Sequence, residues 1–330
     1  MDKIFADFIA GHKHICIIQA ENPDGDSLSS SLALEDILVD HEILLYCPVN
    51  IPKYLHYLEG WSRVTAEFDY SADAYIIVDT SAQVLLSKTL KDPAARDALE
   101  SKPVLVIDHH ITESDLPFDH QIISEQAPAT ASIIYKLAKA NGLKITPAAA
   151  EYLLAGLMSD TLGLTSESTS PDDYRTAAKL LDLGVSIARF EERRREFMKK
   201  SPRILDYKAD LNKRVEYHLD GRLATCHISW EDIREFSDEY NPNVLILEEM
   251  RLVEGVEVAV AIKTYPDGKL TGKVRSTLPV SEQVAGFFGG GGHKFAAGFR
   301  IYESLEATMP ELVRAVDQIL ASSGDDHEAV

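Results

Sequence analysis

The chain has 330 residues, of which 45% are hydrophobic, so it is long enough to form more than one packed domain. Its 33 Lys and Arg residues stand against 53 Asp and Glu residues, which gives a formal net charge of -20. Because so acidic a surface repels long polyanions, the composition argues against a protein that binds long duplex nucleic acid. Short nucleotides, or a metal that screens phosphate charge, remain compatible with it.

The three cysteines, Cys16, Cys47 and Cys226, are odd in number, and two of them lie in apolar runs typical of strands. We expect buried, reduced thiols, as in a cytoplasmic protein. The first residues contain neither a basic nor a long apolar segment, and no apolar run reaches the length of a membrane span. The sequence therefore predicts a cytoplasmic protein with no membrane partner.

The first apolar run, residues 14–19, predicts a strand, and an amphipathic pattern from Leu28 onward predicts a helix. The loop between them carries Asp24 and Asp26 next to a proline and a glycine, so the two carboxylates can converge on one point. In the alternative interpretation, Asp26 or Ser27 caps the helix and Asp24 only fills the turn. The loop alone does not decide between the two.

Three further apolar runs predict strands, at residues 43–47, 74–80 and 103–107. Asp79 lies at the end of the second run, and Asp108, His109 and His110 follow the third directly. Because helical stretches alternate with these strands, we expect a largely parallel sheet whose strand ends meet at one edge. One acid after a strand is typical of a turn, but several acids and two histidines indicate a site at this edge.

Three helices are expected next, at residues 130–141, 147–160 and 171–183, the last two starting with proline in the first turn. Asp160 lies at the end of the second helix, where the helix dipole disfavours a negative charge. We therefore expect a compensating cation beside Asp160, either a metal ion or a lysine.

Charged residues are concentrated at 189–203, which favours an exposed helix and a connection between domains; alternatively, these arginines line a phosphate-binding cleft. Beyond them, turn signals at 219–221 and 266–268 predict two hairpins, and residues 243–252 and 305–320 predict helices. We therefore expect a smaller α+β domain. The assigned segments are an N-terminal domain at 1–186, a linker helix at 187–207, a C-terminal domain at 208–322 and a disordered tail at 323–330.

Four successive glycines, at 289–292, precede His293. Such a run costs backbone entropy and buries nothing, so we interpret it as a cradle of backbone amides for an anion; the alternative is a flexible loop. Arg275 ends a nearby predicted strand, and its guanidinium suits a two-point phosphate contact. The residues predicted to bind substrate are Arg275, Ser276, Gly290, Gly291, Gly292 and His293.

The polar strand ends combine carboxylates with imidazoles, a donor set that suits manganese and other first-row divalent ions. The set consists of Asp24, Asp26, Asp79, Asp108, His109, His110 and Asp160. So many acids require about two cations, and two metals roughly 3.5–4 Å apart are typical of phosphoester hydrolysis. We therefore expect two divalent cations, with Mn²⁺ preferred, and a phosphoesterase.

The order of these motifs resembles that of the DHH phosphoesterase superfamily and its DHH-associated C-terminal domain. The matching segments are Asn22-Pro23-Asp24-Gly25-Asp26, Val78-Asp79-Thr80, Asp108-His109-His110, Gly156-Leu157-Met158-Ser159-Asp160-Thr161, Gly290-Gly291-Gly292-His293 and Ala296-Ala297-Gly298. The compact layout is most similar to that of the bifunctional oligoribonucleases and pAp phosphatases. The resemblance implies an α/β fold, with a parallel-sheet N-terminal domain, a smaller α+β C-terminal domain and an active site in the cleft between them.

The resemblance also implies roles for single residues. Asp79 would bridge two metals, Asp24 would bind the first, and Asp26, His109 and Asp160 would bind the second. The catalytic residues would be His110, as a substrate contact or proton donor, and Asp108, which would orient the histidines. Arg275 and the loop ending at His293 would hold the far phosphate or base of the substrate.

One position departs from the family pattern. The family carries a metal-binding histidine three residues before the proline of the first motif, and here that residue is Ala20. The first metal would then be weakly held, be bound by water, or have a substitute ligand. Of the two neighbours, Gln19 and Glu21, we consider Glu21 able to supply an oxygen if the loop rotates.

The function predicted from the sequence is manganese-dependent hydrolysis of short RNA oligonucleotides, linear dinucleotides or 3',5'-bisphosphate nucleotides (pAp). A first alternative is a cyclic-dinucleotide phosphodiesterase. A second is a nucleotide-binding protein whose catalysis is reduced or lost because of Ala20. The oligomeric state stays open, with a homodimer as one option.

Overall fold

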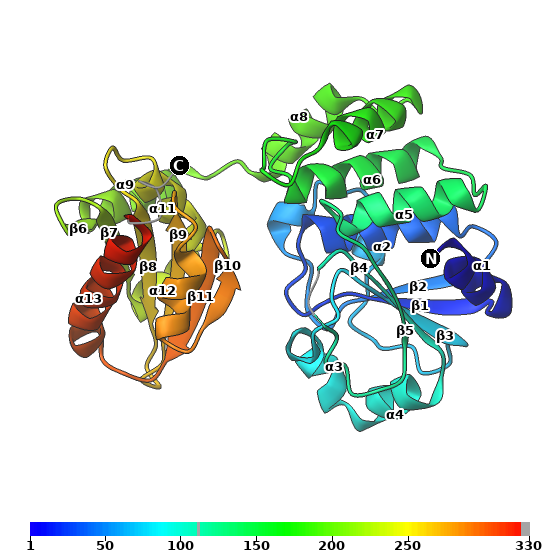
Figure 1. Ribbon diagram of the computed structural model, residues 1–330, viewed down its shortest axis with the longest axis horizontal. Coiled ribbons are helices and arrows are strands. Elements are labelled where there is room, and N and C mark those ends of the chain that lie inside the picture. Colours follow the sequence, from blue (N-terminus) through cyan, green and yellow to red (C-terminus); the bar gives the residue numbers. More distant parts are fainter. Residues whose placement is uncertain (111–112, 325–330) are drawn as a thin grey trace. The chain divides into compact units, whose positions relative to one another are not determined.

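The computed structural model describes residues 1–110 and 113–324, which divide between Lys199 and Lys200 into two compact units. The charged segment that we assigned to a linker forms two helices, α8 (Ile187–Phe197) and α9 (Pro202–Lys213), one on each side of this division. Phe190 of α8 is buried in the core of the first unit, and Ile204 of α9 is buried in the second. Each helix thus packs on its own unit (Figure 1).

The first unit is built on a sheet of five parallel strands in the order β2-β1-β3-β4-β5. The strands are β1 (His14–Ile18), β2 (Glu42–Tyr46), β3 (Ala74–Val78), β4 (Val104–Asp108) and β5 (Gln121–Ser124). The four strands expected from the apolar runs are confirmed. Strand β5 was not expected from the sequence, because this short edge strand is mostly exposed and lacks an apolar run.

Helices cover both faces of this sheet (Figure 1). The helical elements of the unit, besides α8, are α1 (Asp2–Gly11), α2 (Gly25–Ile37), η1 (Lys53–Leu55), η2 (Trp61–Arg63), η3 (Gln83–Leu86), α3 (Ser87–Lys91), α4 (Pro93–Ser101), α5 (Thr130–Ala140), α6 (Pro147–Asp160) and α7 (Pro171–Asp182). Alternate residues of β1 enter the two cores: Ile15 and Ile17 pack with α2, α5 and α6, while Cys16 and Ile18 pack on the side of α3 and α4. This double burial explains the unbroken apolar runs.

The second unit has a six-stranded mixed sheet in the order β10-β11-β9-β8-β7-β6. Its strands are β6 (Glu216–His218), β7 (Leu223–Ile228), β8 (Val258–Thr264), β9 (Leu270–Ser276), β10 (Gly291–His293) and β11 (Ala296–Ile301). Both predicted hairpins are confirmed, since β6 pairs with β7 and β8 with β9 in antiparallel fashion. With the parallel sheet of the first unit, this confirms the predicted fold class.

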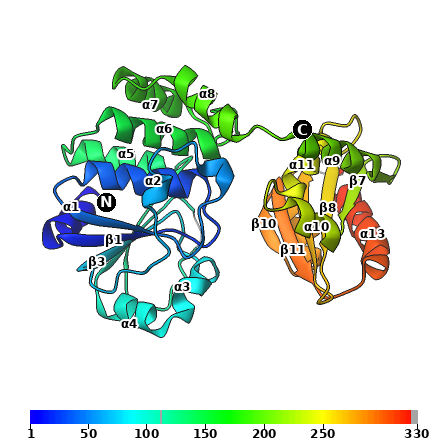
Figure 2. The ribbon, with the colours of Figure 1, turned by 180° about the vertical axis from the view of Figure 1, so that it is seen from behind.

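The helices of the second unit lie on both faces of its sheet: α9, α10 and α11 on one (Figure 2), and α12 and α13 on the other. Besides α9, they are α10 (Trp230–Phe236), α11 (Pro242–Arg251), α12 (Ser281–Phe287) and α13 (Leu305–Gly324). The last helix extends two residues into the segment predicted as a disordered tail. The rest of that predicted tail, residues 325–330, lies outside the described residues.

The second half of the glycine run, Gly291 and Gly292, lies in a strand of the structure, and Gly289 and Gly290 precede that strand, so the alternative of a flexible loop does not hold for the second half. Residues Gly291–His293 form β10 and pair with β11. A Cβ on Gly290 would lie 2.3 Å from the carbonyl oxygen of Gly298, and one on Gly292 would lie 2.7 Å from the carbonyl oxygen of Ala296. Two of the glycines are therefore required by the close packing of this segment on β11, whatever else their amides bind.

All three cysteines are free and buried, as expected. Burial raises the pKa of the Cys47 thiol to about 11, so it stays protonated at neutral pH. In the part of the chain that the structure describes, we find no helix with the length and apolar character needed to cross a membrane.

Replacing Gly290 by alanine tests the packing explanation. We expect Gly290→Ala to lower the free energy of unfolding by about 1–3 kcal/mol, because the new methyl group overlaps the β11 backbone. Denaturant unfolding measures the change. Gly291→Ala is the matched control, because a Cβ there meets no atom within 4 Å; equal stability of the two variants would contradict the explanation.

Candidate metal and catalytic site

The site is formed at the carboxyl edge of the first sheet. Asp79 follows β3, and His109 and His110 follow the adjacent strand β4. Candidate ligand atoms lie within 4.8 Å of one another in two groups: Asp79, His109 and His110, and Asp26, His109 and Asp160. The structure thus brings together five residues that the sequence assigned to the site, and His109 belongs to both groups.

His109 presents one ring nitrogen to the carboxylates. Its Nδ1 donates a hydrogen bond to the carbonyl oxygen of Ala127 at 3.1 Å, which assigns the proton to Nδ1 in the neutral ring. Nε2 lies 3.3 Å from Asp160 Oδ2 and 3.5 Å from Asp79 Oδ1. This nitrogen is buried and makes no hydrogen bond to the described residues. In the neutral ring, the lone pair of Nε2 is therefore oriented as a metal ligand requires.

The acids around His109 carry more negative charge than the site can stabilise by itself. Burial, and then the charge of Asp160, raise the pKa of Asp26 to about 7. Burial and the charge of Asp26 raise the pKa of Asp79 well above its usual value. Although burial favours the neutral imidazole, the adjacent Asp160 and the charge of Asp26 raise the pKa of His109 to about 9. All three shifts indicate a site that lacks positive charge, which a divalent cation would supply.

Asp26 also connects the site to helix α5. Its Oδ2 accepts a hydrogen bond from the backbone N–H of Thr130 at 2.6 Å, and its Oδ1 accepts one from that of Ala131 at 3.1 Å. These two amides belong to the first turn of α5, where N–H groups have no partner within the helix. The buried carboxylate therefore fixes the beginning of α5 against the site.

Asp79 has an unusual backbone conformation. Its φ of 62° lies in the left-handed region, which costs a residue with a Cβ about 1–2 kcal/mol. The Thr130 hydroxyl donates a hydrogen bond to Asp79 Oδ1 at 3.0 Å. The strained turn and this hydrogen bond together hold the carboxylate beside His109.

Asp24 caps helix α2, the role that one interpretation of the loop gave to Asp26 or Ser27. Its Oδ1 accepts hydrogen bonds from the backbone N–H groups of Asp26 at 3.1 Å and Ser27 at 3.0 Å. Desolvation, and then the charge of Asp160, raise its pKa. Asp24 therefore feels the charge of the site, although it belongs to neither of the two ligand groups found among the described residues.

Asp108 orients His110. The buried Oδ1 of Asp108 accepts hydrogen bonds from His110 Nδ1 at 2.7 Å and from the backbone N–H of His110 at 3.1 Å. Burial acts to raise the pKa of Asp108, but the hydrogen bond and charge of His110 outweigh it and lower the pKa overall. Asp108 thus stays ionised and holds the His110 ring in one orientation.

Gly156 is a residue of the site whose role the sequence analysis missed. A Cβ at this position of α6 would lie 2.6 Å from both Asp26 Oδ1 and Ala131 Cβ. Because Gly156 has no side chain, the Asp26 carboxylate fits between α6 and α5. A glycine inside an otherwise helical pattern was the available signal, because such a glycine costs stability unless it serves packing.

The two neighbours of Ala20, Gln19 and Glu21, differ in whether their side chains are free to act as a metal ligand. Both carboxylate oxygens of Glu21 are engaged, one by the Ser87 hydroxyl at 2.7 Å and the other by the backbone N–H of Lys88 at 3.2 Å. Glu21 is thus held at α3, against our expectation that it could replace a missing ligand. Gln19 is fully buried, and neither side-chain amide atom has a hydrogen-bond partner among the described residues.

The residues predicted to bind substrate lie in the second unit. Arg275, on β9, is half-buried, and its guanidinium donates a hydrogen bond to the carbonyl oxygen of Val274. Ser276 is fully buried, and its hydroxyl contacts the Leu278 carbonyl oxygen and the Ser281 hydroxyl, so it stabilises the fold here. Gly290 lies beside β11, Gly291 and Gly292 lie on β10, and the side chain of His293 lies outside what the structure describes.

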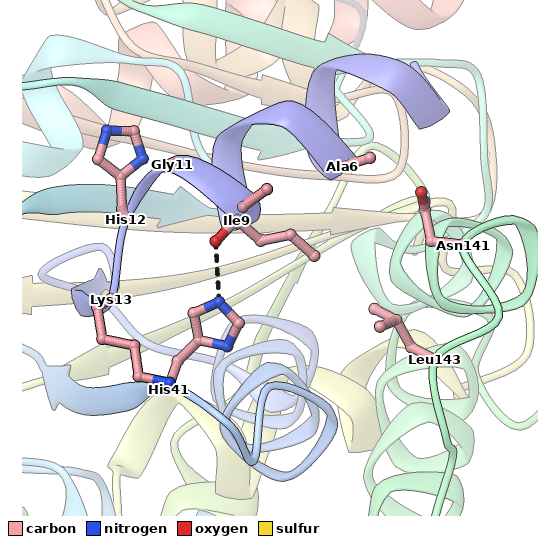
Figure 3. A pocket seen from close by; sticks show the side chains of 9 residues that line it. Ala6, Ile9, Gly11, His12, Lys13, His41, Asn141 and Leu143 are labelled. Atoms are coloured by element: carbon pink, nitrogen blue, oxygen red, sulfur yellow. Dashed lines mark hydrogen bonds between the residues drawn. The ribbon is translucent and has the colours of Figure 1, made fainter.

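A separate pocket of 470 Å³ lies at the amino edge of the same sheet (Figure 3). His12 Nδ1 contacts the carbonyl oxygen of Phe8, and His41 Nε2 contacts that of Ile9 (Figure 3); both carbonyls belong to the last turn of α1. These contacts cap the helix and account for both histidines. The pocket is at the opposite edge from the acids, since the parallel strands β1 and β2 begin beside it.

Two family models match the chain. The DHH family N-terminal domain matches residues 14–157, and the DHHA1 domain matches residues 232–322; together they cover well over half of the chain. The chain belongs to the DHH family. This confirms the resemblance based on the sequence motifs.

Known proteins resemble this DHH-family chain over different lengths. A bifunctional oligoribonuclease and PAP phosphatase NrnA of Thermus thermophilus is 29% identical over 306 residues, 89% of each chain. A probable manganese-dependent inorganic pyrophosphatase of Streptococcus pyogenes is 28% identical over 184 residues, 51% of this chain and 55% of its own length. The crystal structure of an exopolyphosphatase-related protein from Bacteroides fragilis has a TM-score of 0.83 at 22% identity, over 97% of this chain and 95% of its own, and supports the fold.

Membership in this family, with NrnA-type relatives that align over nearly the whole length, makes the chain a hydrolase of the phosphoesterase class. The carboxylate and imidazole donors of the site are consistent with a divalent metal.

Replacing Gly156 by alanine tests its role beside Asp26. We expect Gly156→Ala to weaken any divalent-metal binding at the site and to lower the free energy of unfolding by about 1–3 kcal/mol, because the methyl group displaces Asp26 or α5. Calorimetric titration with Mn²⁺ and denaturant unfolding measure the two effects. In Gly286→Ala, the control, a Cβ meets nothing within 4 Å; unchanged metal affinity in Gly156→Ala would refute the role.

Proposed function

We propose that this DHH-family chain is a manganese-dependent phosphoesterase that hydrolyses short RNA oligonucleotides or linear dinucleotides and dephosphorylates pAp. The observation that carries the proposal is the buried Nε2 of His109, which has no hydrogen bond to the described residues and lies beside Asp79 and Asp160. This arrangement of donors is costly without a cation and suits one well.

The donors present fit a divalent metal. Asp26, Asp79, His109 and Asp160 would hold it, with Asp24 adjacent to them. When bound, the metal would polarise a phosphoryl oxygen and lower the pKa of a water molecule. Two metals are proposed from the number of acids, and manganese from the mixed donor set and from the similarity to a probable manganese-dependent pyrophosphatase.

The chain's own groups position the substrate and move the proton. His110 contacts a phosphoryl oxygen or gives a proton to the leaving oxygen. Asp108 accepts the Nδ1 hydrogen bond of His110, which fixes the orientation of the ring and stabilises the ring when it is protonated. His110 therefore transfers its proton from one fixed orientation. In the second unit, Arg275 and the glycine segment that ends at His293 bind another part of the substrate through N–H groups.

Short substrates are supported by two observations. The net charge of -20 opposes binding of long polyanions. The Thermus thermophilus relative, aligned over 89% of both chains, is named an oligoribonuclease and PAP phosphatase. Cyclic dinucleotides are the alternative substrate, and product analysis distinguishes them, because ring opening gives a linear dinucleotide first.

His109→Ala tests the proposed activity. With Mn²⁺, the native chain should release mononucleotides from a labelled RNA dinucleotide or trinucleotide, and phosphate from pAp. The variant should lose more than about 100-fold in kcat/KM. Mutation of a group that hydrogen-bonds to a metal ligand typically costs about 10- to 100-fold, and removal of the ligand itself should cost more.

His120→Ala is the matched control, because His120 precedes β5 at the opposite edge of the sheet, where it contacts the Phe118 carbonyl oxygen and ring. It should keep native activity. If the native chain with saturating Mn²⁺ leaves short oligonucleotides, cyclic dinucleotides and pAp intact, the enzymatic proposal fails.

A second candidate function is a nucleotide-binding protein with reduced catalysis. The observation that favours it is Ala20, which is buried beside the motif loop and has no side-chain donor, while Glu21 is engaged elsewhere. For this candidate we expect calorimetric binding of pAp without turnover. Ala20→His should then raise both the number of Mn²⁺ ions bound per chain and the hydrolysis rate; an unchanged metal count would show that Ala20 does not limit the site.

A further inference from the structure

An exposed leucine lies beside the acids of the site. Helix α6 ends at Asp160, and Leu162 follows two residues later, in the turn that leads away from the helix. The side chain of Leu162 is 72% exposed. A single exposed leucine is ordinary on a protein surface. The backbone that carries this one is not.

The turn that contains Leu162 is strained. The φ angles of Leu162, Gly163 and Leu164 are 52°, 75° and 68°, so three successive residues adopt the left-handed conformation. Glycine adopts this conformation freely, whereas the Cβ makes it unfavourable for the two leucines. A glycine at position 162 would relieve part of the strain, and little packing would be lost because Leu162 is exposed. The stability of the fold therefore does not explain this side chain, and strain of this kind is typical of a functional position.

Hydrogen bonds hold the strained turn in place. The buried Thr161 hydroxyl donates to the carbonyl oxygen of Leu157 at 2.6 Å and accepts from the backbone N–H of Leu164 at 2.9 Å. The Tyr174 hydroxyl donates to the carbonyl oxygen of Leu164 at 2.6 Å, and the Leu164 side chain packs against the core of the first unit. These contacts keep Leu162 in one position beside the end of α6, as a preorganised contact surface requires.

An exposed aromatic ring lies beside the same group of acids. Tyr54, in η1, is 52% exposed, and its hydroxyl donates a hydrogen bond to the carbonyl oxygen of Pro23 at 3.4 Å. Burial of part of the side chain, and then the charge of Asp24, raise the pKa of the Tyr54 phenol. Burial, and then the charge of Asp160, raise the pKa of Asp24 in turn. Tyr54 and Leu162 thus border two neighbouring acids of the site.

We propose that Tyr54 and Leu162 contact the nucleobase of the nucleotide whose phosphate is bound at the acid site, and we call these two side chains the base rim. This inference rests on the proposed function for the class of substrate. An aromatic ring stacks on the flat face of any base, and an aliphatic side chain buries apolar surface on such a face. The base rim therefore selects nucleotides over phosphate esters that have no base.

The base rim lies where a nucleotide would place its base. Only the ribose separates the base from the 5'-phosphate, so a side chain that contacts the base must lie near the groups that bind the phosphate. Leu162 is two residues from Asp160, and Tyr54 is hydrogen-bonded to the residue that precedes Asp24. Both side chains meet this requirement.

The test compares binding of AMP with binding of ribose 5-phosphate, which lacks the base, by the full-length chain with saturating Mn²⁺. Titration calorimetry gives the two dissociation constants, and their ratio reports the contribution of the base. The variants are Leu162→Gly, Tyr54→Ala and Tyr54→Phe. Val39→Gly is the control, because Val39 is equally exposed and follows α2, at the opposite end of this helix from Asp24.

The native chain should bind AMP about tenfold or more tightly than ribose 5-phosphate, because stacking of one base on an aromatic side chain contributes about 5- to 150-fold in affinity. Leu162→Gly and Tyr54→Ala should each lower this preference about threefold or more. Tyr54→Phe, which retains the ring, and Val39→Gly should keep it. Leu162→Gly should also unfold at an equal or higher denaturant concentration, because glycine relieves the strained φ, so misfolding would not explain its weaker preference.

Several results would overturn the inference. They are a native chain that binds AMP no more tightly than ribose 5-phosphate, a native preference in either Leu162→Gly or Tyr54→Ala, and a loss in Tyr54→Phe or Val39→Gly as large as that in Tyr54→Ala. Unfolding of Leu162→Gly at a lower denaturant concentration than the native chain would contradict the argument from strain.

Hydrolysis of pAp and of an RNA dinucleotide by the native chain with Mn²⁺ separates this inference from the proposed function. If the native chain hydrolyses them but the preference for AMP does not depend on Tyr54 and Leu162, the inference fails and the function stands. If hydrolysis is absent but the preference depends on both side chains, the base rim stands and the function fails.

Discussion

The first unit depends on negative charge held inside the protein. Asp26 and Asp79 are buried around His109. Burial and then the charge of Asp160 raise the pKa of Asp26, and burial and then the charge of Asp26 raise the pKa of Asp79. A fold retains such a cluster only if the rest of the structure fixes it in place. The parallel strands β3 and β4 deliver Asp79 and His109 to one edge, and α2 and α6 bring Asp26 and Asp160 to the same point. The burial of these carboxylates therefore costs the fold stability, while the same carboxylates are the proposed ligands of a metal ion.

Much of this arrangement could be predicted from the sequence. The four apolar strands, the starts of α6 and α7 at proline, and the hairpins around 219–221 and 266–268 follow from local patterns that agree with the tertiary fold. The strand ends were enough to place Asp79 and His109 at one edge, because parallel strands have a single carboxyl edge. The family match then confirmed the family resemblance that these motifs suggested.

The features of the fold and site that could not be predicted depend on contacts between residues far apart in the sequence. Asp26 bonds to amides of Thr130 and Ala131, more than 100 positions away, and Gly156 matters only because α6 passes beside both. The glycine run was interpreted as an amide cradle, and its pairing with β11 was not expected, because residues without side chains have no periodic signature. Strand β5 was missed for a similar reason, since an exposed edge strand has no apolar run.

The hydrogen bonds from α5 to Asp26 have a consequence for the apoprotein. The carboxylate that would share a cation's charge is also the acceptor for the first turn of α5, a helix that supplies none of the proposed metal ligands. When Asp26 takes up a proton in place of a cation, it becomes a weaker acceptor for those amides. Loss of metal would therefore loosen the start of α5, and with it the Thr130 hydroxyl that holds Asp79. The site would then become less well organised to receive the next ion, which couples metal affinity to the order of a neighbouring helix.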